Sequence, residues 1–193
     1  MLCTITFCKQ YIKTKLVIKR NMKLDTKALG LTTSYLSSLG QELLPNFSGV
    51  TSCDTIDLIF PDFEVTRSCI INTLEQYFQR GGHWIGLFYN AAKKRLYYWD
   101  PFGLPPLNKH ILAFLKKAAT SKKVKVLYYS QSVQGLLSVF CGFHVLSFLI
   151  HKELNMPSSD FFDLYDQKNL HLNDEISATF ITEYIKEQQP KRA

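Results

Sequence analysis

The chain has 193 residues, which is enough for one compact domain with a sizeable core and too few for two domains to be the default. Its apolar fraction of 46% and charged fraction of 20% are ordinary for a globular protein, and its formal net charge is +7. No apolar run is long enough to span a bilayer, and lysines interrupt the apolar residues near the N-terminus. We therefore expect a soluble, intracellular monomer without a membrane span or secretory signal.

The five cysteines form no CxxC pair and no regular framework. An odd number with such spacing argues against a disulfide scaffold and against a zinc finger. We therefore predict no metal site and at least one free thiol. The five are Cys3, Cys8, Cys53, Cys69 and Cys141.

The positive charge is unevenly distributed along the chain. Residues 1–30 carry seven Lys or Arg against one Asp, residues 105–130 carry six Lys and no acid, and residues 151–193 carry five basic against eight acidic side chains. A basic surface attracts polyanions by releasing their counterions, so DNA is a candidate partner. A solvated lysine face explains the same pattern equally well. The change in character predicts a basic N-terminal extension over 1–30 and a folded domain over 31–193.

The first half of this domain is predicted to mix one helix with strands. Leucines and a tyrosine with helical spacing predict a helix over 31–44, and 48–63 has the composition of a loop. Residues 68–78 fit either a buried strand or a short helix. β-branched and aromatic side chains predict strands over 83–90 and 95–100, which a short turn joins into a hairpin.

The second half is predicted to be mainly helical. Helical periodicity predicts a helix over 107–119, and lysines that alternate with valines predict a strand over 123–130. A buried helix should span 139–150, and an amphipathic helix 173–189 with Asn173 as its N-cap. Strands and helices mix without strict βαβ alternation, so the fold class is α+β. In the helix over 107–119, five side chains are expected to face inward, namely Leu107, Ile111, Leu112, Phe114 and Leu115.

Cys141 stands where a polar loop enters the predicted buried helix. A helix N-terminus lowers the pKa of a thiol, because unpaired N–H groups and the helix dipole favour its charged form. The position alone is weak evidence of catalysis, since a free cysteine is more often a small buried apolar residue. A nucleophilic thiol also needs a base, a group that orients the base, and donors for an oxyanion.

His83 is the histidine best placed to act as this base. It heads a predicted strand, and Asp100 ends the partner strand seventeen residues later, so both should lie at one edge of the sheet. Considered alone, His83 is equally well explained as a core or surface histidine. His144 lies on the Cys141 helix and points away from its N-terminus. His110 and His151 have lysine neighbours that indicate a surface position, and His171 lies in a loop.

Gln134 precedes Cys141 by seven residues and is followed by a flexible glycine. Its amide could donate to an oxyanion if the loop folds back over the thiol, with the backbone N–H of Cys141 as a second donor. A single loop glutamine is more commonly exposed to solvent. The joint placement of His, Asp, Gln and Cys at the edges of elements favours the catalytic interpretation.

Three segments resemble the adenovirus endopeptidase (adenain) family, namely GGHWIGLFYN, YYWDPFG and SQSVQGLLSVFCGF. The similar region runs from about residue 49 to 151, and it has the family order of His, acid, Gln and Cys with matching spacings. The resemblance implies an adenain-like cysteine protease fold, in which a central mixed sheet lies between helices and the nucleophile begins a helix. The catalytic residues that it implies are His83, Asp100, Gln134 and Cys141.

The same resemblance implies a cysteine endopeptidase that cleaves viral capsid and core precursor proteins, often at glycine-containing sites, in the virion and the host nucleus. His83 would take the proton of Cys141, Asp100 would orient the imidazole, Gln134 would help to form the oxyanion hole, and Trp84 would pack against the histidine. No cofactor is expected, although activation by DNA or by a capsid-derived peptide is a trait of the family.

The sequence departs from the family pattern in three places. The acid is Asp100 where adenain has Glu, and the segment between the acid and Gln134 is shorter by about ten residues. Adenain binds its activating peptide through a disulfide, and the cysteine responsible would align near Lys123, where this chain has none. We therefore do not expect covalent peptide activation at this position.

Two alternatives remain open. Proteases of ubiquitin-like modifiers belong to the same clan, but they usually carry an acidic residue before the cysteine, where this chain has Phe140. A catalytically silent, DNA-binding virion protein with the same fold is the second alternative, and the basic segments favour it.

Overall fold

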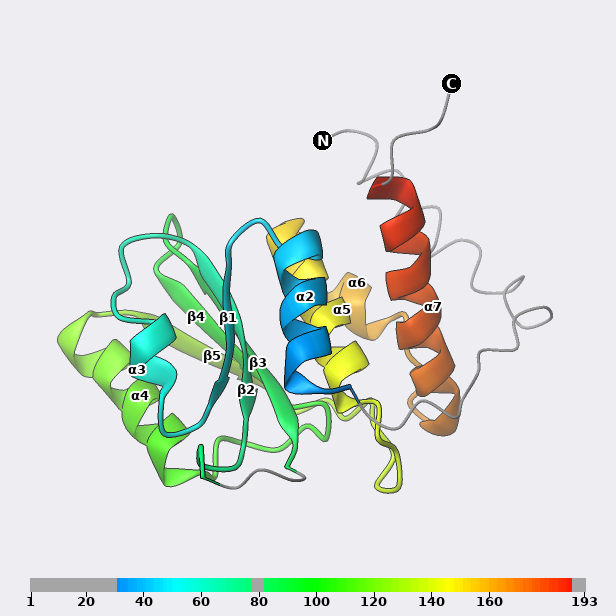
Figure 1. The fold of residues 1–193 in the computed structure, drawn as a ribbon, viewed down its shortest axis with the longest axis horizontal. Coiled ribbons are helices and arrows are strands. Elements are labelled where there is room, and N and C mark those ends of the chain that lie inside the picture. The colour runs from blue at the N-terminus through cyan, green and yellow to red at the C-terminus, as the bar shows by residue number, and fades with distance from the viewer. Residues whose placement is uncertain (1–30, 78–81, 189–193) are drawn as a thin grey trace.

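Five strands with helices on both sides form three layers in the computed structural model, which describes residues 31–77 and 82–188 (Figure 1). In chain order the elements are α2 (Thr33–Leu43), β1 (Phe47–Ser52), α3 (Ile56–Ile59), β2 (Arg67–Asn72), β3 (Trp84–Asn90), β4 (Arg95–Trp99), α4 (Lys109–Ser121), β5 (Lys125–Tyr129), α5 (Cys141–Glu153), α6 (Ser158–Phe162) and α7 (His171–Gln188). The predicted basic extension over 1–30 lies outside the described residues. Within the described part, no helix has the length and apolar character that crossing a membrane requires.

The strands form a single mixed sheet in the order β1-β2-β3-β4-β5. The central strands β2, β3 and β4 are antiparallel, whereas the edge strands β1 and β5 run parallel to their neighbours. β3 and β4 are the hairpin predicted from the sequence, and Gly86 pairs with Trp99 in its register. The expected α+β class with a central mixed sheet is therefore confirmed.

Helices cover both faces of this sheet. α3 and α4 lie on one face, while α2 and α5 lie on the other, with α6 and α7 beyond α5 (Figure 1). Side chains alternate along β3, so that Ile85, Leu87 and Tyr89 enter the core under α3 and α4, whereas Trp84 and Phe88 enter the core under α5. The strand is buried on both faces, because each face of the sheet has its own core.

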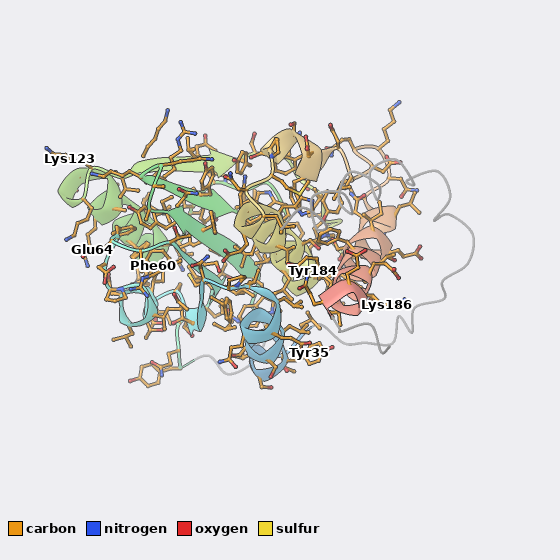
Figure 2. The ribbon with its side chains drawn as sticks, turned by 90° about the horizontal axis from the view of Figure 1, so that it is seen from above. Tyr35, Phe60, Glu64, Lys123, Tyr184 and Lys186 are labelled. Carbon is orange, nitrogen blue, oxygen red and sulfur yellow. The ribbon has the colours of Figure 1, made fainter. Side chains whose placement is uncertain are left out.

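The core under α3 and α4 is far from the C-terminal helix. Phe60 contacts Phe114 and Tyr89 there, with ring centroids 5.6 and 6.4 Å apart. Figure 2 shows Phe60 on this side, with Lys123 at one end of the molecule and Lys186 of α7 at the other. α5 therefore occupies the middle of the molecule, between the sheet and α7.

The first half of the domain differs from the prediction in one segment. The sequence predicts a loop over 48–63, but this range contains most of β1 and all of α3. β1 is an edge strand whose six residues are all half-buried, so its sequence lacks the alternation that identifies a strand. The segment 68–78, which fitted a strand or a helix, contains most of the strand β2.

Two of the five side chains predicted to face inward on α4 are exposed. Leu107 is 74% exposed, because it lies before the first turn of the helix, and Leu112 is 37% exposed. The remaining three are buried as predicted, and they are Ile111, Phe114 and Leu115.

The last helix begins earlier than predicted. α7 starts at His171, so this histidine is not in a loop, and the predicted N-cap Asn173 lies inside the helix. Asn173 is fully buried, and its Nδ2 donates hydrogen bonds to the carbonyls of Val133 at 2.9 Å and Asp166 at 3.0 Å. The asparagine therefore satisfies buried carbonyl groups instead of capping the helix.

His151 is buried, although the sequence predicts a surface position from its lysine neighbour. It is 1% exposed, and its Nδ1 donates to the carbonyl of Ser147 at 2.8 Å. Burial lowers the pKa of His151 to about 4, so the ring is neutral in the core. The prediction failed because the neighbour, Lys152, is itself buried.

Candidate active site

Cys141 is the first residue of α5, which begins two residues later than predicted but keeps the cysteine at the helix N-terminus, as expected. Phe140 before it supplies no capping side chain, and the first turn has no acidic residue, so no side chain neutralises the positive end of the helix dipole. The N–H of Phe140 donates instead to Oγ of Ser138 at 3.1 Å. The thiol is free and the residue is 8% exposed, so negative charge on the sulfur would face the N–H groups of this turn.

His83 and Asp100 lie side by side at the open end of the β3–β4 hairpin. His83 precedes Trp84, the first residue of β3, and Asp100 follows Trp99, the last residue of β4. Nε2 of His83 lies 2.7 Å from Oδ1 of Asp100, and Asp100 is only 4% exposed. The contact predicted from the hairpin is therefore present.

The turn after β4 fixes the position of the Asp100 carboxylate. The N–H of Phe102 donates to Oδ1 of Asp100 at 2.8 Å, and the N–H of Gly103 donates to the Asp100 carbonyl at 2.7 Å. Gly103 has a φ of 70°, and a Cβ at this position would lie 2.5 Å from the carbonyl oxygen of Ser130. Only glycine fits here, so the glycine of the PFG sequence is a requirement of the turn.

Phe102 is the aromatic side chain that stacks on His83. The ring centroids are 4.5 Å apart with an interplanar angle of 25°. The family resemblance implies this packing for Trp84, but the indole Nε1 of Trp84 donates to the carbonyl of Leu31 at 3.2 Å and so ties the start of α2 to the hairpin. The ring of Phe102 limits the rotation of the imidazole, and sequence reasoning did not identify it.

His83 is hydrogen-bonded to Asp100 and lies close enough to Cys141 for the thiol to influence its pKa. Because Asp100 occupies Nε2, Nδ1 is the ring nitrogen left for the thiol. Burial alone would lower the pKa of His83, but hydrogen bonds to Asp100 and Cys141, together with their negative charges, raise it to about 9. The imidazole is therefore protonated at neutral pH, and its charge attracts negative charge on the adjacent sulfur.

Gln134 is buried, with 2% of its surface exposed, although it lies in the loop before α5. Its backbone N–H donates to the carbonyl of Pro101 at 3.1 Å, which ties this loop to the turn that holds Asp100. Its Nε2 donates to the carbonyl of Ser138 at 2.9 Å. An amide nitrogen carries two hydrogens, so a second donor remains for a ligand in the cleft.

One cleft of about 790 Å³ brings these groups together, and His83, Gln134 and Cys141 all line it. The start of α2 at 31–33 and the edge strand β1 at 50–52 form its walls. The sequence predicts the groups that meet in this cleft but not its β1 wall, because residues 48–63 have the composition of a loop.

A buried network behind the Gln134 loop joins that loop to α7. Oδ1 of Asp174 accepts hydrogen bonds from Oγ of Ser138 at 2.8 Å and from Nε2 of His144 at 3.0 Å. His144 is fully buried, and its Nδ1 bonds Oγ of Ser177 at 2.7 Å. Burial lowers the pKa of His144, which keeps the ring neutral beside Asp174. His144 faces α7 and not the thiol, and nothing in the sequence pattern predicted this network.

Comparison with known proteins places the chain in a family. The family model described as adenovirus endoprotease matches residues 53–189. The protease of Porcine adenovirus A serotype 3 is 31% identical over 135 residues, which cover 63% of this chain and 63% of that protein. The protease of Bovine adenovirus 7 is 30% identical over 156 residues, which cover 67% of this chain and 76% of that protein. The match to the porcine virus protein thus spans less than two thirds of its length.

A solved structure shares the fold. The crystal structure of the ASFV (African swine fever virus) protease matches with a TM-score of 0.59 and 16% identity, covering 82% of this chain and 68% of that one. At this identity the likeness concerns the fold, which is the expected mixed sheet between helices. The match to the family model does not depend on this structural likeness, and it extends over most of the sequence. The chain belongs to the adenovirus endoprotease family.

Proposed function

We propose that this protein is a cysteine endopeptidase with Cys141 as nucleophile, His83 as base, Asp100 as the group that orients the base, and Gln134 as an oxyanion donor. The observation that carries the proposal is the position of His83, which is hydrogen-bonded to the Asp100 carboxylate and lines the same cleft as the Cys141 thiol, close enough for the thiol to influence its pKa. A thiol, an imidazole and a carboxylate in this order are the groups that acyl transfer by a cysteine requires.

The reaction uses these groups in two steps. Sγ of Cys141 attacks the scissile carbonyl carbon, and the oxygen that becomes negative accepts hydrogen bonds from the Cys141 N–H and from Nε2 of Gln134. The C–N bond then breaks, and His83 gives its proton to the leaving amine. In the second step His83 takes a proton from water, which attacks the thioester carbon and releases Cys141 as thiolate. Because these groups supply every proton and charge, we expect no metal or other cofactor to be needed.

The substrates that we propose are capsid and core precursor proteins of a virus, cut at glycine-containing sites in the virion or the host nucleus. Membership of the adenovirus endoprotease family supports this class of substrate. Exposed apolar side chains beside the cleft also suit a protein substrate, since Leu136 and Leu137 are 90% and 91% exposed and are separated from Gln134 only by Gly135. DNA remains a proposed partner for the lysines of α4 and its neighbours.

Cleavage of two substrate types tests this function. A capsid precursor should be cut by the wild type at glycine-containing sites, and replacing those glycines with valine should prevent the cut, as read by mass spectrometry of the products. A conjugate of a ubiquitin-like modifier should stay intact under the same conditions. Cleavage of the conjugate after its terminal Gly-Gly, with the precursor untouched, would instead establish the modifier protease.

The network behind the oxyanion loop leads to a prediction for Asp174. Replacing Asp174 with alanine removes the acceptor of Ser138 and His144, so the loop that carries Gln134 loses its anchor. We expect kcat to fall by about 10- to 100-fold with little change in KM, because the oxyanion donor is misplaced. The rate at which a thiol reagent labels Cys141 should stay close to the wild-type rate.

Glu175→Ala is the matched control for this prediction, since Glu175 is the exposed neighbour on the same helix. It should retain wild-type kcat. A loss of thiol labelling by Asp174→Ala that parallels its loss of kcat would indicate general disruption of the site and would contradict a positioning role.

A further inference from the structure

A second pocket lies at the other end of α5 from Cys141. Its volume is about 320 Å³, and β3, β4, β5, the end of α5 and the segment before α6 line it. Lys152, in the last turn of α5, follows Cys141 by eleven residues, which corresponds to about 16 Å along a helix axis. No residue lines both cavities, so the pocket is separate from the cleft.

Lys152 is almost completely buried, with 6% of its surface exposed. Its Nζ donates to Oη of Tyr129 at 3.1 Å and to Oγ of Ser158 at 2.5 Å, and it lies 4.6 Å from the ring centroid of Tyr97. Burial lowers the pKa of Lys152 to about 8, with a contribution from the charge of Lys93, so the ammonium is still charged at neutral pH. A buried charge without a counter-charge is costly.

The described residues around this ammonium supply no counter-charge. Two further cations line the pocket, Lys93 and Arg95, and the lining includes no aspartate or glutamate. An ammonium has three N–H donors, of which two are used by the hydroxyls, so one remains. The hydroxyl oxygens of Tyr129 and Ser158 lie 2.6 Å apart, so one hydroxyl hydrogen joins them and the other is free. The pocket therefore combines positive charge with unused hydrogen-bond donors.

We propose that this pocket binds a phosphate-class oxyanion, which Lys152 contacts from within and Lys93 and Arg95 contact from the rim. A phosphate group carries more than one charge and presents oxygens in several directions, so it suits three cations from two parts of the chain better than a single carboxylate does. The bound anion would provide the counter-charge that Lys152 lacks. Free phosphates and the phosphates of a nucleic-acid backbone share this chemistry.

Calorimetric titration with sodium triphosphate at constant ionic strength tests this site. The wild type should bind saturably, Arg95→Gln about tenfold more weakly, and Lys152→Met at least about 100-fold more weakly. Lys116→Met removes an exposed lysine of α4 and serves as the matched control, which should bind as the wild type does. Arg95 is exposed, so Arg95→Gln is expected to fold even if Lys152→Met does not.

Absence of saturable triphosphate binding would overturn this assignment. Equal weakening by Lys116→Met and Arg95→Gln would also overturn it, because it would indicate a diffuse basic surface. A duplex oligonucleotide that displaces triphosphate from the wild type identifies backbone phosphates as ligands, whereas one that leaves triphosphate bound identifies free phosphates. These measurements require no proteolysis, so the site can fail or succeed independently of the proposed function.

Discussion

Cys141→Ala is expected to abolish peptide-bond cleavage, and His83→Ala to lower kcat/KM by about 10⁴-fold or more. The alanine at 141 removes the sulfur that forms the thioester, and the alanine at 83 removes both the proton acceptor and the positive charge beside that sulfur. Both side chains border the cleft, so the fold should be retained. Initial rates on a precursor peptide, together with thermal unfolding curves, measure the two effects.

Cys53→Ala is the control for these variants. Cys53 is also buried and free, but its sulfur accepts a hydrogen bond from Nδ2 of Asn108 at 3.3 Å and does not line the cleft. This variant should therefore cleave at the wild-type rate. Turnover by His83→Ala close to that of the wild type would disprove the assigned base and, with it, the proposed triad.

Thiol reactivity separates a working protease from a catalytically silent protein of the same fold. Burial raises the pKa of Cys53 and, more strongly, of Cys69, which makes both poor nucleophiles at neutral pH. Cys141 instead lies beside a protonated His83. An electrophilic probe at neutral pH should therefore label Cys141 first, and peptide mapping of the labelled protein identifies the site. Equal labelling of all the thiols would favour the silent alternative.

Local signals in the sequence were sufficient to predict how the candidate catalytic groups are placed in this site. The hairpin was evident from two short strands and the turn between them, and its geometry alone placed His83 next to Asp100. The apolar run over 139–150 predicted the helix, and Cys141 lies near the start of this run. These relations depend on residues close together in the chain, where periodicity and turn chemistry are informative.

The surroundings of the site could not be predicted, because they depend on contacts between distant segments. Asp174, which accepts a hydrogen bond from Ser138 in the loop that carries Gln134, follows Ser138 by 36 positions and lies on a helix whose start was misplaced. β1 is an edge strand in which buried and exposed residues do not alternate. No pattern in its sequence therefore indicated that it forms a wall of the cleft. Burial of the charged Lys152 also contradicts the usual preference of lysine for the surface.

Two substitutions of Asp100 should separate its charge from its hydrogen bonds. Asp100→Asn keeps an oxygen that can accept from the Phe102 N–H and face Nε2 of His83, but it removes the negative charge. Asp100→Ala removes both, which leaves that N–H unpaired and the imidazole oriented only by its stacking on Phe102. We expect kcat/KM to fall by about 10- to 100-fold in the asparagine variant and by about 10³- to 10⁴-fold in the alanine variant.

The pH dependence of the asparagine variant identifies the role of the charge. In the wild type the imidazolium of His83 persists until the pH passes its pKa of about 9, so kcat/KM should fall only above this pH. Loss of the Asp100 charge removes one cause of the raised pKa, so the alkaline limb should move to lower pH. Asp57→Asn, which removes an exposed carboxylate on α3, should leave the profile unchanged. An unshifted alkaline limb in Asp100→Asn would mean that another group sets the protonation state of the imidazole.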